Sequence, residues 1–266
     1  MKIARTALQL IGFVLLAAML AGCSGSAGGS GRMLKVGVRT NLPNFSAYNE
    51  QADTYYGFEA DLAAELAERL GYDGVTYVGL SPEERESALA SGQVDCLIAA
   101  FSYTEDRAAE FDLSEPYYYD AGRVMVENST LFADYADLRG TTVAVREGTT
   151  ARENLAAKLV SEGLIASAAQ ADSFLTIVEY ASYDEMNAAL EYGDVDALCA
   201  DGCITLPWLD SERSYFEQPC SEEDYVIASA KGSTLSEKIS AALADLTEDG
   251  TLAQLGGKWG VTNENA

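Results

Sequence analysis

The sequence predicts an α/β protein with two similar lobes, and two observations carry this prediction. First, strand-like runs alternate with helix-like runs: strands at 34–38, 76–78 and 94–100 are separated by helices that begin at Glu59 and Pro82. This alternation is typical of βαβ units and of a largely parallel sheet. Second, the segment ALASGQVDCLIAA at 88–100 matches ALEYGDVDALCAD at 189–201. Both segments read as a helix, a glycine turn and a buried strand, as expected if the chain contains two related α/β lobes.

Apolar spacing and capping signals place the individual elements. Leu62, Leu66 and Leu70 recur every four residues and form one core-facing stripe. Ser81-Pro82-Glu83-Glu84 reads as an N-cap, a first-turn proline and a capping-box glutamate. The rest of the chain predicts strands at 141–145, 174–180 and 225–229, with helices at 149–162, after Ser182 and after Thr234.

Composition excludes several classes of function. The 266 residues include 42 acidic and 17 basic side chains, for a formal charge of −25, and such a surface repels phosphate backbones and anionic membranes. Histidine is absent, which excludes histidine-based triads, general bases and metal sites. We therefore expect no nucleic-acid partner and no metal ion. The sequence also has no GxSxG, P-loop, EF-hand or CxxC motif, so we expect no cofactor and no catalytic residue.

The N-terminus is typical of an export signal. Residues 1–22 carry two basic residues ahead of a short apolar run, which is the pattern of a signal peptide. The last residues of this run and Cys23 resemble the bacterial lipobox, so we expect lipidation at Cys23 and a flexible tether within 23–32. The protein would then be lipid-anchored to the cell membrane on its extracytoplasmic face. The alternative is a retained membrane anchor, for which the apolar run is short.

Seven ordered blocks of the chain resemble one known family. They lie at 57–71, 92–107, 111–122, 145–150, 193–201, 225–233 and 249–260, and they are similar to the family 3 solute-binding proteins of polar amino-acid ABC importers. The resemblance implies a two-lobed periplasmic-binding-protein (Venus-flytrap) fold with two crossover strands near Tyr118 and Tyr225. Its first lobe would contain residues 33–119 and 225–266, and its second lobe residues 120–224.

The resemblance also implies a function and a set of ligand contacts. The protein would be a monomer that captures a polar amino acid and delivers it to the permease of an ABC importer, without enzymatic activity. Arg107 corresponds to the arginine that binds the α-carboxylate, and Asp201 to the aspartate that binds the ammonium group. The alternatives are a surface ion pair of Arg107 with Glu110 and a turn at Asp201. The other contacts would come from Ser102, the backbone of Ala100, Gly148, Thr149 and Thr150, and helix capping by the threonines is compatible with this role.

Arginines favour a ligand with an anionic or amide side chain. The resemblance implies that Arg39, Arg85 and Arg146 lie near the distal end of the ligand, which favours glutamate, aspartate or glutamine by charge complementarity. The alternative is that these arginines pair with Glu147, Glu59 or Glu86. Many members of the family carry aromatic rings where this chain has Leu42 and Pro82, so the two-ring clamp on the ligand is missing. The candidates to replace it are Tyr48, Tyr55 and Tyr56.

The remaining cysteines predict two kinds of site. Cys96 and Cys199 fall inside strands and are expected to be buried thiols. Cys203 and Cys220 lie beyond strand ends in one lobe, and a disulfide between them would contribute about 3 kcal/mol.

Two other functions compete with transport. One is a ligand sensor that acts in trans on a membrane partner. The other is an enzyme that resembles the cyclohexadienyl dehydratases of this fold, for which the cleft offers no general acid besides Asp201.

Overall fold

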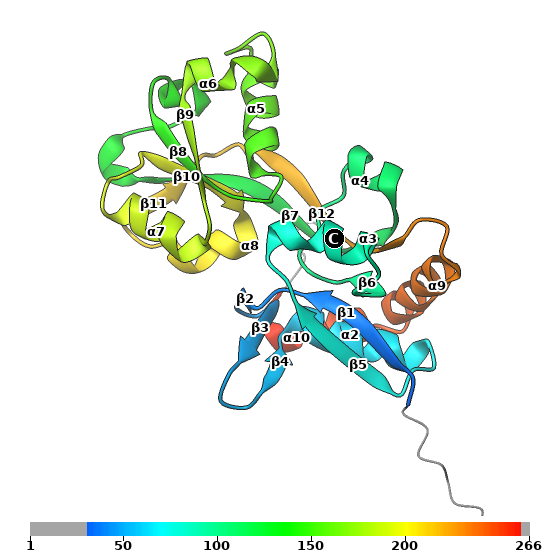
Figure 1. The fold of residues 1–266 in the computed structure, drawn as a ribbon. Helices are drawn as coiled ribbons and strands as arrows, with labels where there is room; N and C mark the ends of the chain where they lie inside the picture. The colour runs from blue at the N-terminus through cyan, green and yellow to red at the C-terminus, as the bar shows by residue number, and fades with distance from the viewer. Residues whose placement is uncertain (1–30, 262–266) are drawn as a thin grey trace, which may run out of the picture. The chain divides into compact units, whose positions relative to one another are not determined.

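The computed structural model describes residues 31–261. Its main sheet has nine strands (Figure 1). In spatial order they are β5 (Gly74–Gly79), β1 (Met33–Val38), β6 (Cys96–Leu97), β12 (Ser221–Ala230), β7 (Phe111–Glu127), β10 (Ala197–Asp201), β8 (Thr142–Arg146) and β9 (Thr176–Tyr180), while β11 (Arg213–Tyr215) pairs with β7.

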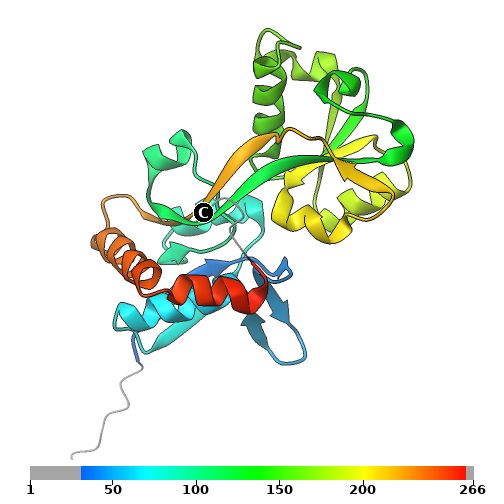
Figure 2. The ribbon, with the colours of Figure 1, turned by 180° about the vertical axis from the view of Figure 1, so that it is seen from behind.

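Two long strands connect the halves of the molecule. β7 and β12 are antiparallel, with Tyr225 opposite Tyr118, and they run side by side between two groups of elements (Figure 2). We call the group around β1, β5 and β6 the first lobe and the group around β8, β9, β10 and β11 the second lobe. Within each lobe the neighbours of the central strand are parallel, as the alternating pattern predicts.

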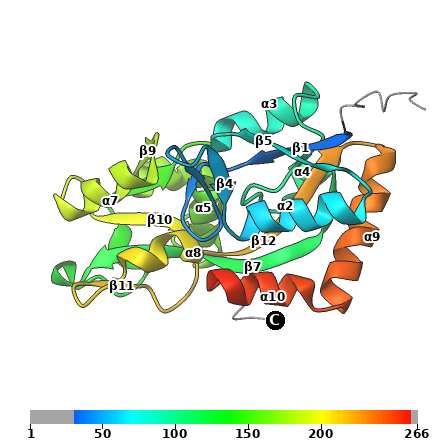
Figure 3. The same ribbon diagram turned by 90° about the horizontal axis from the view of Figure 1, so that it is seen from below.

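The first lobe buries its sheet under helices from both ends of the chain. Its helices are α2 (Phe58–Arg69), α3 (Arg85–Ala90), α4 (Glu105–Glu110), α9 (Thr234–Glu248) and α10 (Thr251–Trp259), and a small sheet joins β2 (Asn41–Leu42), β3 (Ser46–Asn49) and β4 (Thr54–Tyr56). The predicted stripe is confirmed at Leu62 and Leu66, which are fully buried. α10 packs against α2 and α9 (Figure 3).

The second lobe contains α5 (Ala151–Ser161), α6 (Ala171–Phe174), α7 (Tyr183–Glu191) and α8 (Gly202–Thr205). Its separate core includes Leu155, Leu159 and Phe174. Another core cluster is shared by the lobes, because it contains Leu62 of the first lobe and Met186 and Leu198 of the second.

Two predicted strands are shorter than expected. β6 covers only Cys96–Leu97 of the predicted 94–100, because the backbone leaves the extended conformation and Ala100 has a φ of +47°. In 174–180 the strand begins at Thr176, because Leu175 N still donates to Ala171 O at the end of α6. The capping box of Ser81 and Glu84 is confirmed and precedes α3.

The membrane-related predictions fall largely outside the described residues. The expected signal peptide, residues 1–22, and the expected lipid attachment at Cys23 are among the residues that the structure does not describe. Among residues 31–261, every helix is too short or too polar to cross a membrane.

Candidate functional site

Four loops that follow parallel strands carry the predicted site residues. Arg39 follows β1, Ala100 and Ser102 follow β6, Gly148 follows β8, and Asp201 ends β10. The carboxyl ends of parallel strands are the usual place for ligands in α/β sheets. Because the first two loops belong to the first lobe and the last two to the second, the candidate site draws on both lobes.

The turn at Ala100 is held by a buried carboxylate. Ala100 N donates to Glu59 Oε1 at 2.6 Å, and Tyr117 Oη donates to the same oxygen at 2.6 Å. Glu59 is fully buried, and its Oε2 has no hydrogen-bond partner. Burial raises the pKa of Glu59, while hydrogen bonds from Tyr117 and Ala100 and the charges of Arg39 and Arg85 oppose the shift. Glu59 therefore fixes a backbone conformation that residues other than glycine rarely adopt.

Arg85 lies between the two lobes. Its side chain is buried, and it donates from Nε to Pro82 O at 3.1 Å and from one terminal nitrogen to Ala99 O at 2.9 Å and Ala100 O at 2.6 Å. The other terminal nitrogen donates to Gly148 O at 3.1 Å. Burial, followed by the charges of Arg39 and Arg107, lowers the pKa of Arg85 to about 9. The predicted site residues Ala100 and Gly148 are thus joined through this guanidinium.

Arg107 is positioned at the start of α4. Its N–H donates to Thr104 Oγ1, the N-cap of the helix, at 3.1 Å. The side chain donates from Nε to Glu86 Oε1 at 2.9 Å and from a terminal nitrogen to Ser102 O at 2.8 Å. Its guanidinium carbon lies 4.0 Å from the centre of the Phe101 ring. The acidic partner is Glu86 instead of the Glu110 considered from sequence, because α3 and the loop after β6 are adjacent.

Asp201 is a partly buried carboxyl with a tyrosine donor. Tyr225 Oη donates to Asp201 Oδ2. Burial and the negative charges of Glu223 and Asp120 hold the pKa of Asp201 well above its ordinary value. A cationic group placed beside Asp201 would therefore strongly stabilise the ionised form of this carboxyl group.

The loop after β8 approaches the first lobe closely. Gly148 has a φ of +71°, and a Cβ added there would lie 2.6 Å from Glu83 N. Thr149 Oγ1 donates to Arg146 O at 2.7 Å, and Thr150 Oγ1 donates to Glu223 Oε2 at 3.4 Å. Glycine is needed at position 148 both for the left-handed backbone and for the contact with the first lobe.

The other predicted arginines also have identified partners. Arg39 donates to Asn41 Oδ1 at 3.1 Å, and Arg146 forms an ion pair of 3.2 Å with Glu83 across the lobes. Both side chains are buried, and each keeps an Nε without a partner. Arg39 therefore retains an unused donor in a position that influences Arg85.

The residues considered for the aromatic clamp lie in the first lobe. Leu42 is buried in the first-lobe core. The rings of Tyr48 and Tyr55 are tilted by 48° with centres 4.9 Å apart, and the ring centre of Tyr56 lies 6.1 Å from that of Trp259. These rings pack on the small sheet and its neighbours, so their contacts give no support to a role as a ligand clamp.

The expected disulfide is not formed in this structure. Cys203 and Cys220 are both free thiols. Cys203 Sγ lies 3.5 Å from Tyr225 Oη, whereas the thiol of Cys220 raises the pKa of Cys199 by hydrogen bonding. The two cysteines have different neighbours because Cys203 begins α8 while Cys220 precedes β12. Cys96 and Cys199 are buried, as predicted.

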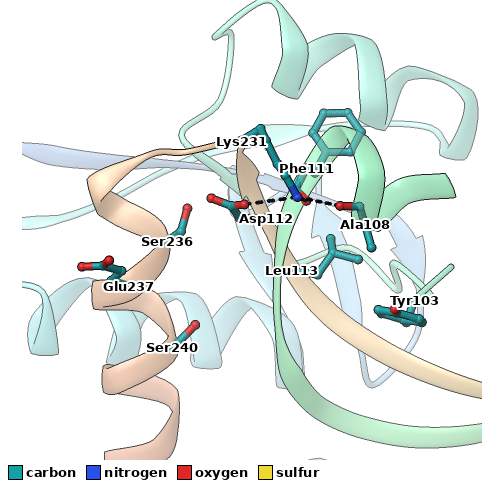
Figure 4. A pocket seen from close by; sticks show the side chains of 9 residues that line it. All are labelled: Tyr103, Ala108, Phe111, Asp112, Leu113, Lys231, Ser236, Glu237 and Ser240. Carbon is teal, nitrogen blue, oxygen red and sulfur yellow. Dashed lines mark hydrogen bonds and ion pairs between the residues drawn. The ribbon is translucent and has the colours of Figure 1, made fainter. Parts of the chain in front are cut away.

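Two cavities differ in their position relative to these loops, and the smaller one includes Gly202 and Cys203, which directly follow Asp201. One, of about 630 Å³, is on the first lobe, where Lys231 Nζ donates to Ala108 O and Phe111 O and pairs with Asp112 (Figure 4). The other, of about 350 Å³, lies beside the crossover strands and is lined in part by Tyr118, Asp120, Arg123, Cys203 and Tyr215. Neither contains the predicted ligand residues.

Glu59, Tyr117 and Tyr225 are site residues that sequence reasoning did not identify. All three lie within blocks that resemble the family, at 57–71, 111–122 and 225–233, and this position was the available signal. Their partners come from other segments of the chain, so the contacts themselves had no sequence signature.

Known proteins resemble this chain over most of its length. The model for bacterial extracellular solute-binding proteins, family 3, matches residues 34–262. The glutamine-binding protein GlnH of an ABC transporter of Bacillus subtilis (strain 168) is 26% identical over 229 residues, 84% of this chain and 79% of that protein. The arginine-binding extracellular protein ArtP of the same organism is 26% identical and covers 89% of each chain.

Solved structures agree with these relatives. An ancestral arginine-binding protein bound to arginine has a TM-score of 0.73 at 28% identity, covering 85% of this chain and 97% of its own. Tv2483 bound to L-arginine has a TM-score of 0.76 at 29% identity, covering 87% and 91%. The predicted two-lobed periplasmic-binding-protein fold is confirmed. The chain belongs to the bacterial extracellular solute-binding proteins of family 3.

Proposed function

We propose that this protein binds a polar amino acid between its lobes and delivers it to the permease of an ABC importer. The observation that carries the proposal is a pair of oppositely charged groups, one in each lobe: Arg107 in α4 of the first lobe and Asp201 at the end of β10 in the second. A zwitterion needs a cation for its carboxylate and an anion for its ammonium group, and both gain from exclusion of water.

We assign each end of the ligand to a set of groups. Arg107 would bind the α-carboxylate, with Ser102 and the N–H groups of Gly148, Thr149 and Thr150. Asp201 would bind the ammonium group, with the carbonyl of Ala100. Two features support this assignment: the raised pKa of Asp201 and the position of Gly148–Thr150 before the first turn of α5.

The side chain of the ligand is proposed to be acidic or an amide, as in glutamate, aspartate or glutamine. Arg39, Arg85 and Arg146 are buried at or beside the same loops. Arg39 and Arg85 have no ion pair with a carboxylate among the contacts of residues 31–261 described above. Arg146 uses its charge on Glu83, which makes it the weakest of the three candidates.

We further propose that residues 33–119 with 225–266 and residues 120–224 close as two lobes around β7 and β12. The protein would act as a monomer, anchored through lipid at Cys23 on the extracytoplasmic face of the membrane. Ligand binding would favour the closed arrangement by its higher affinity for that arrangement.

Calorimetric titration tests the proposal. The protein from residue 24 onward is titrated with glutamate, aspartate, glutamine, cystine, arginine and lysine, after native mass spectrometry for a copurified amino acid. We expect tight binding of an acidic or amide member, and a loss of at least about 2 kcal/mol in Arg107→Ala. Failure of every amino acid to bind would refute the function, and a preference for lysine or arginine would refute the ligand class.

A further inference from the structure

Arg85 bonds to both lobes through backbone carbonyls. Four hydrogen bonds leave its guanidinium, three to first-lobe carbonyls of Pro82, Ala99 and Ala100 and one to the second-lobe carbonyl of Gly148. Its side chain is 2% exposed. One side chain therefore joins the loops that follow β6 and β8.

The bridge belongs to a wider contact between the same two segments. Glu83, two residues before Arg85, pairs with Arg146 at 3.2 Å. Gly148 approaches Glu83 so closely that even a methyl group would collide with its backbone. The start of α3 and the loop after β8 thus meet through an ion pair, a close backbone approach and the Arg85 bridge.

The surroundings of Arg85 are those that a basic ligand side chain would need. Its guanidinium has carbonyl acceptors and lies 5.2 Å from the centre of the Phe101 ring, an arrangement that stabilises a buried cation. The charge of Arg85 also interacts favourably with the carboxylates of Glu59 and Asp201. A second guanidinium or an ammonium group at the same place would be repelled by the like charges of Arg39 and Arg85.

We propose that Arg85 is a specificity-determining residue: it takes the place of a basic ligand side chain, holds the lobes together and excludes arginine and lysine from the cleft. This inference rests on the proposed function, because it concerns which amino acids the same cleft accepts. It explains how a chain similar to arginine-binding proteins would reject arginine.

The first test is a gain of binding. Arginine is titrated into the wild type, Arg85→Ala and the control Arg152→Ala, whose side chain pairs with Asp172 on the surface of the second lobe. We expect arginine to bind Arg85→Ala at least about tenfold more tightly than the wild type, with Arg152→Ala unchanged. Equal arginine affinity in the wild type and Arg85→Ala would overturn the exclusion.

The second test measures the bridge without any amino acid. Small-angle scattering of the amino-acid-free protein is expected to give a larger radius of gyration for Arg85→Ala than for the wild type. Methylguanidinium, which reproduces the lost group, is expected to restore the wild-type value in Arg85→Ala and to leave Arg152→Ala unchanged. An unchanged radius in Arg85→Ala would overturn the bridge.

A second variant guards against a folding defect. Arg85→Met keeps an apolar stem beside Phe101 but removes every donor, and circular dichroism establishes whether each variant is folded. It should show the same expansion as Arg85→Ala. If the wild type binds no amino acid at all, the proposed function fails, whereas scattering still decides whether Arg85 joins the lobes.

Discussion

Removing the Glu59 carboxylate should destabilise the protein through the Ala100 turn. Glu59→Ala would leave two buried donors, Ala100 N–H and Tyr117 O–H, without the acceptor that each reaches at 2.6 Å. Each orphaned donor costs about 1–3 kcal/mol. The desolvation that raises the pKa of Glu59 offsets part of this cost, so we expect a net loss of about 2–4 kcal/mol in the free energy of unfolding.

Urea denaturation measures this loss, with Glu68→Ala as the matched control. Glu68 lies on the same helix but is exposed, so its replacement tests the helix without touching the turn. Glu59→Gln keeps an acceptor oxygen for both donors and should lose less stability than Glu59→Ala. Equal stability of Glu59→Ala and Glu68→Ala would refute the view that Glu59 holds the Ala100 backbone.

The pH dependence of the free energy of unfolding tests the role of Glu59 independently. Because the folded-state pKa of Glu59 is raised, its favourable contribution is present at low pH and is lost as the pH rises through the folded-state pKa. The wild type should therefore gain stability relative to Glu59→Gln as the pH falls from neutrality toward the ordinary pKa of a glutamate. A difference that grows in the opposite direction would contradict the raised pKa.

Three further predictions concern the contact between the lobes at Gly148, the partly buried carboxyl of Asp201 and the expected lipid anchor at Cys23. Gly148→Ala should weaken amino-acid affinity at least about tenfold in calorimetry. The control Gly163→Ala, which has the same φ of +71° but open space around it, should leave affinity unchanged. Equal losses of affinity in the two variants would rule out a role for the contact between Gly148 and Glu83. Asp201→Asn should raise the free energy of unfolding at neutral pH, because the folded-state pKa of Asp201 is raised and its ionised form opposes folding; urea denaturation at pH 5 and 8 checks the sign. The same variant should lose amino-acid binding. Retained binding would show that Asp201 is not part of the site. Cys23→Ser should release the protein from membranes in cell fractionation, and retention would favour an uncleaved anchor.

The sequence by itself determined the fold class and the places where the site would form. Alternating strands and helices, the recurrence of 88–100 at 189–201 and the capping box at Ser81 are local patterns, and local spacing is sufficient to read them. It also placed Asp201 at the end of a strand, as observed, and Gly148 just before a helix, whereas the strand expected to end at Ala100 already ends at Leu97.

The contacts between groups in the loops after these strands could be learned only from the tertiary structure. Glu59 accepts a hydrogen bond from Ala100 N, 41 residues away in the sequence, and Arg85 donates to Gly148 O, 63 residues away. Arg107 pairs with Glu86 instead of Glu110, and Cys203 faces Tyr225 instead of Cys220. Sequence patterns record the period of each element, whereas these contacts depend on how strands order in the sheet and on which loops the two crossover strands bring together. The physical reason is that hydrogen bonds and ion pairs act over a few ångströms in space, irrespective of separation along the chain.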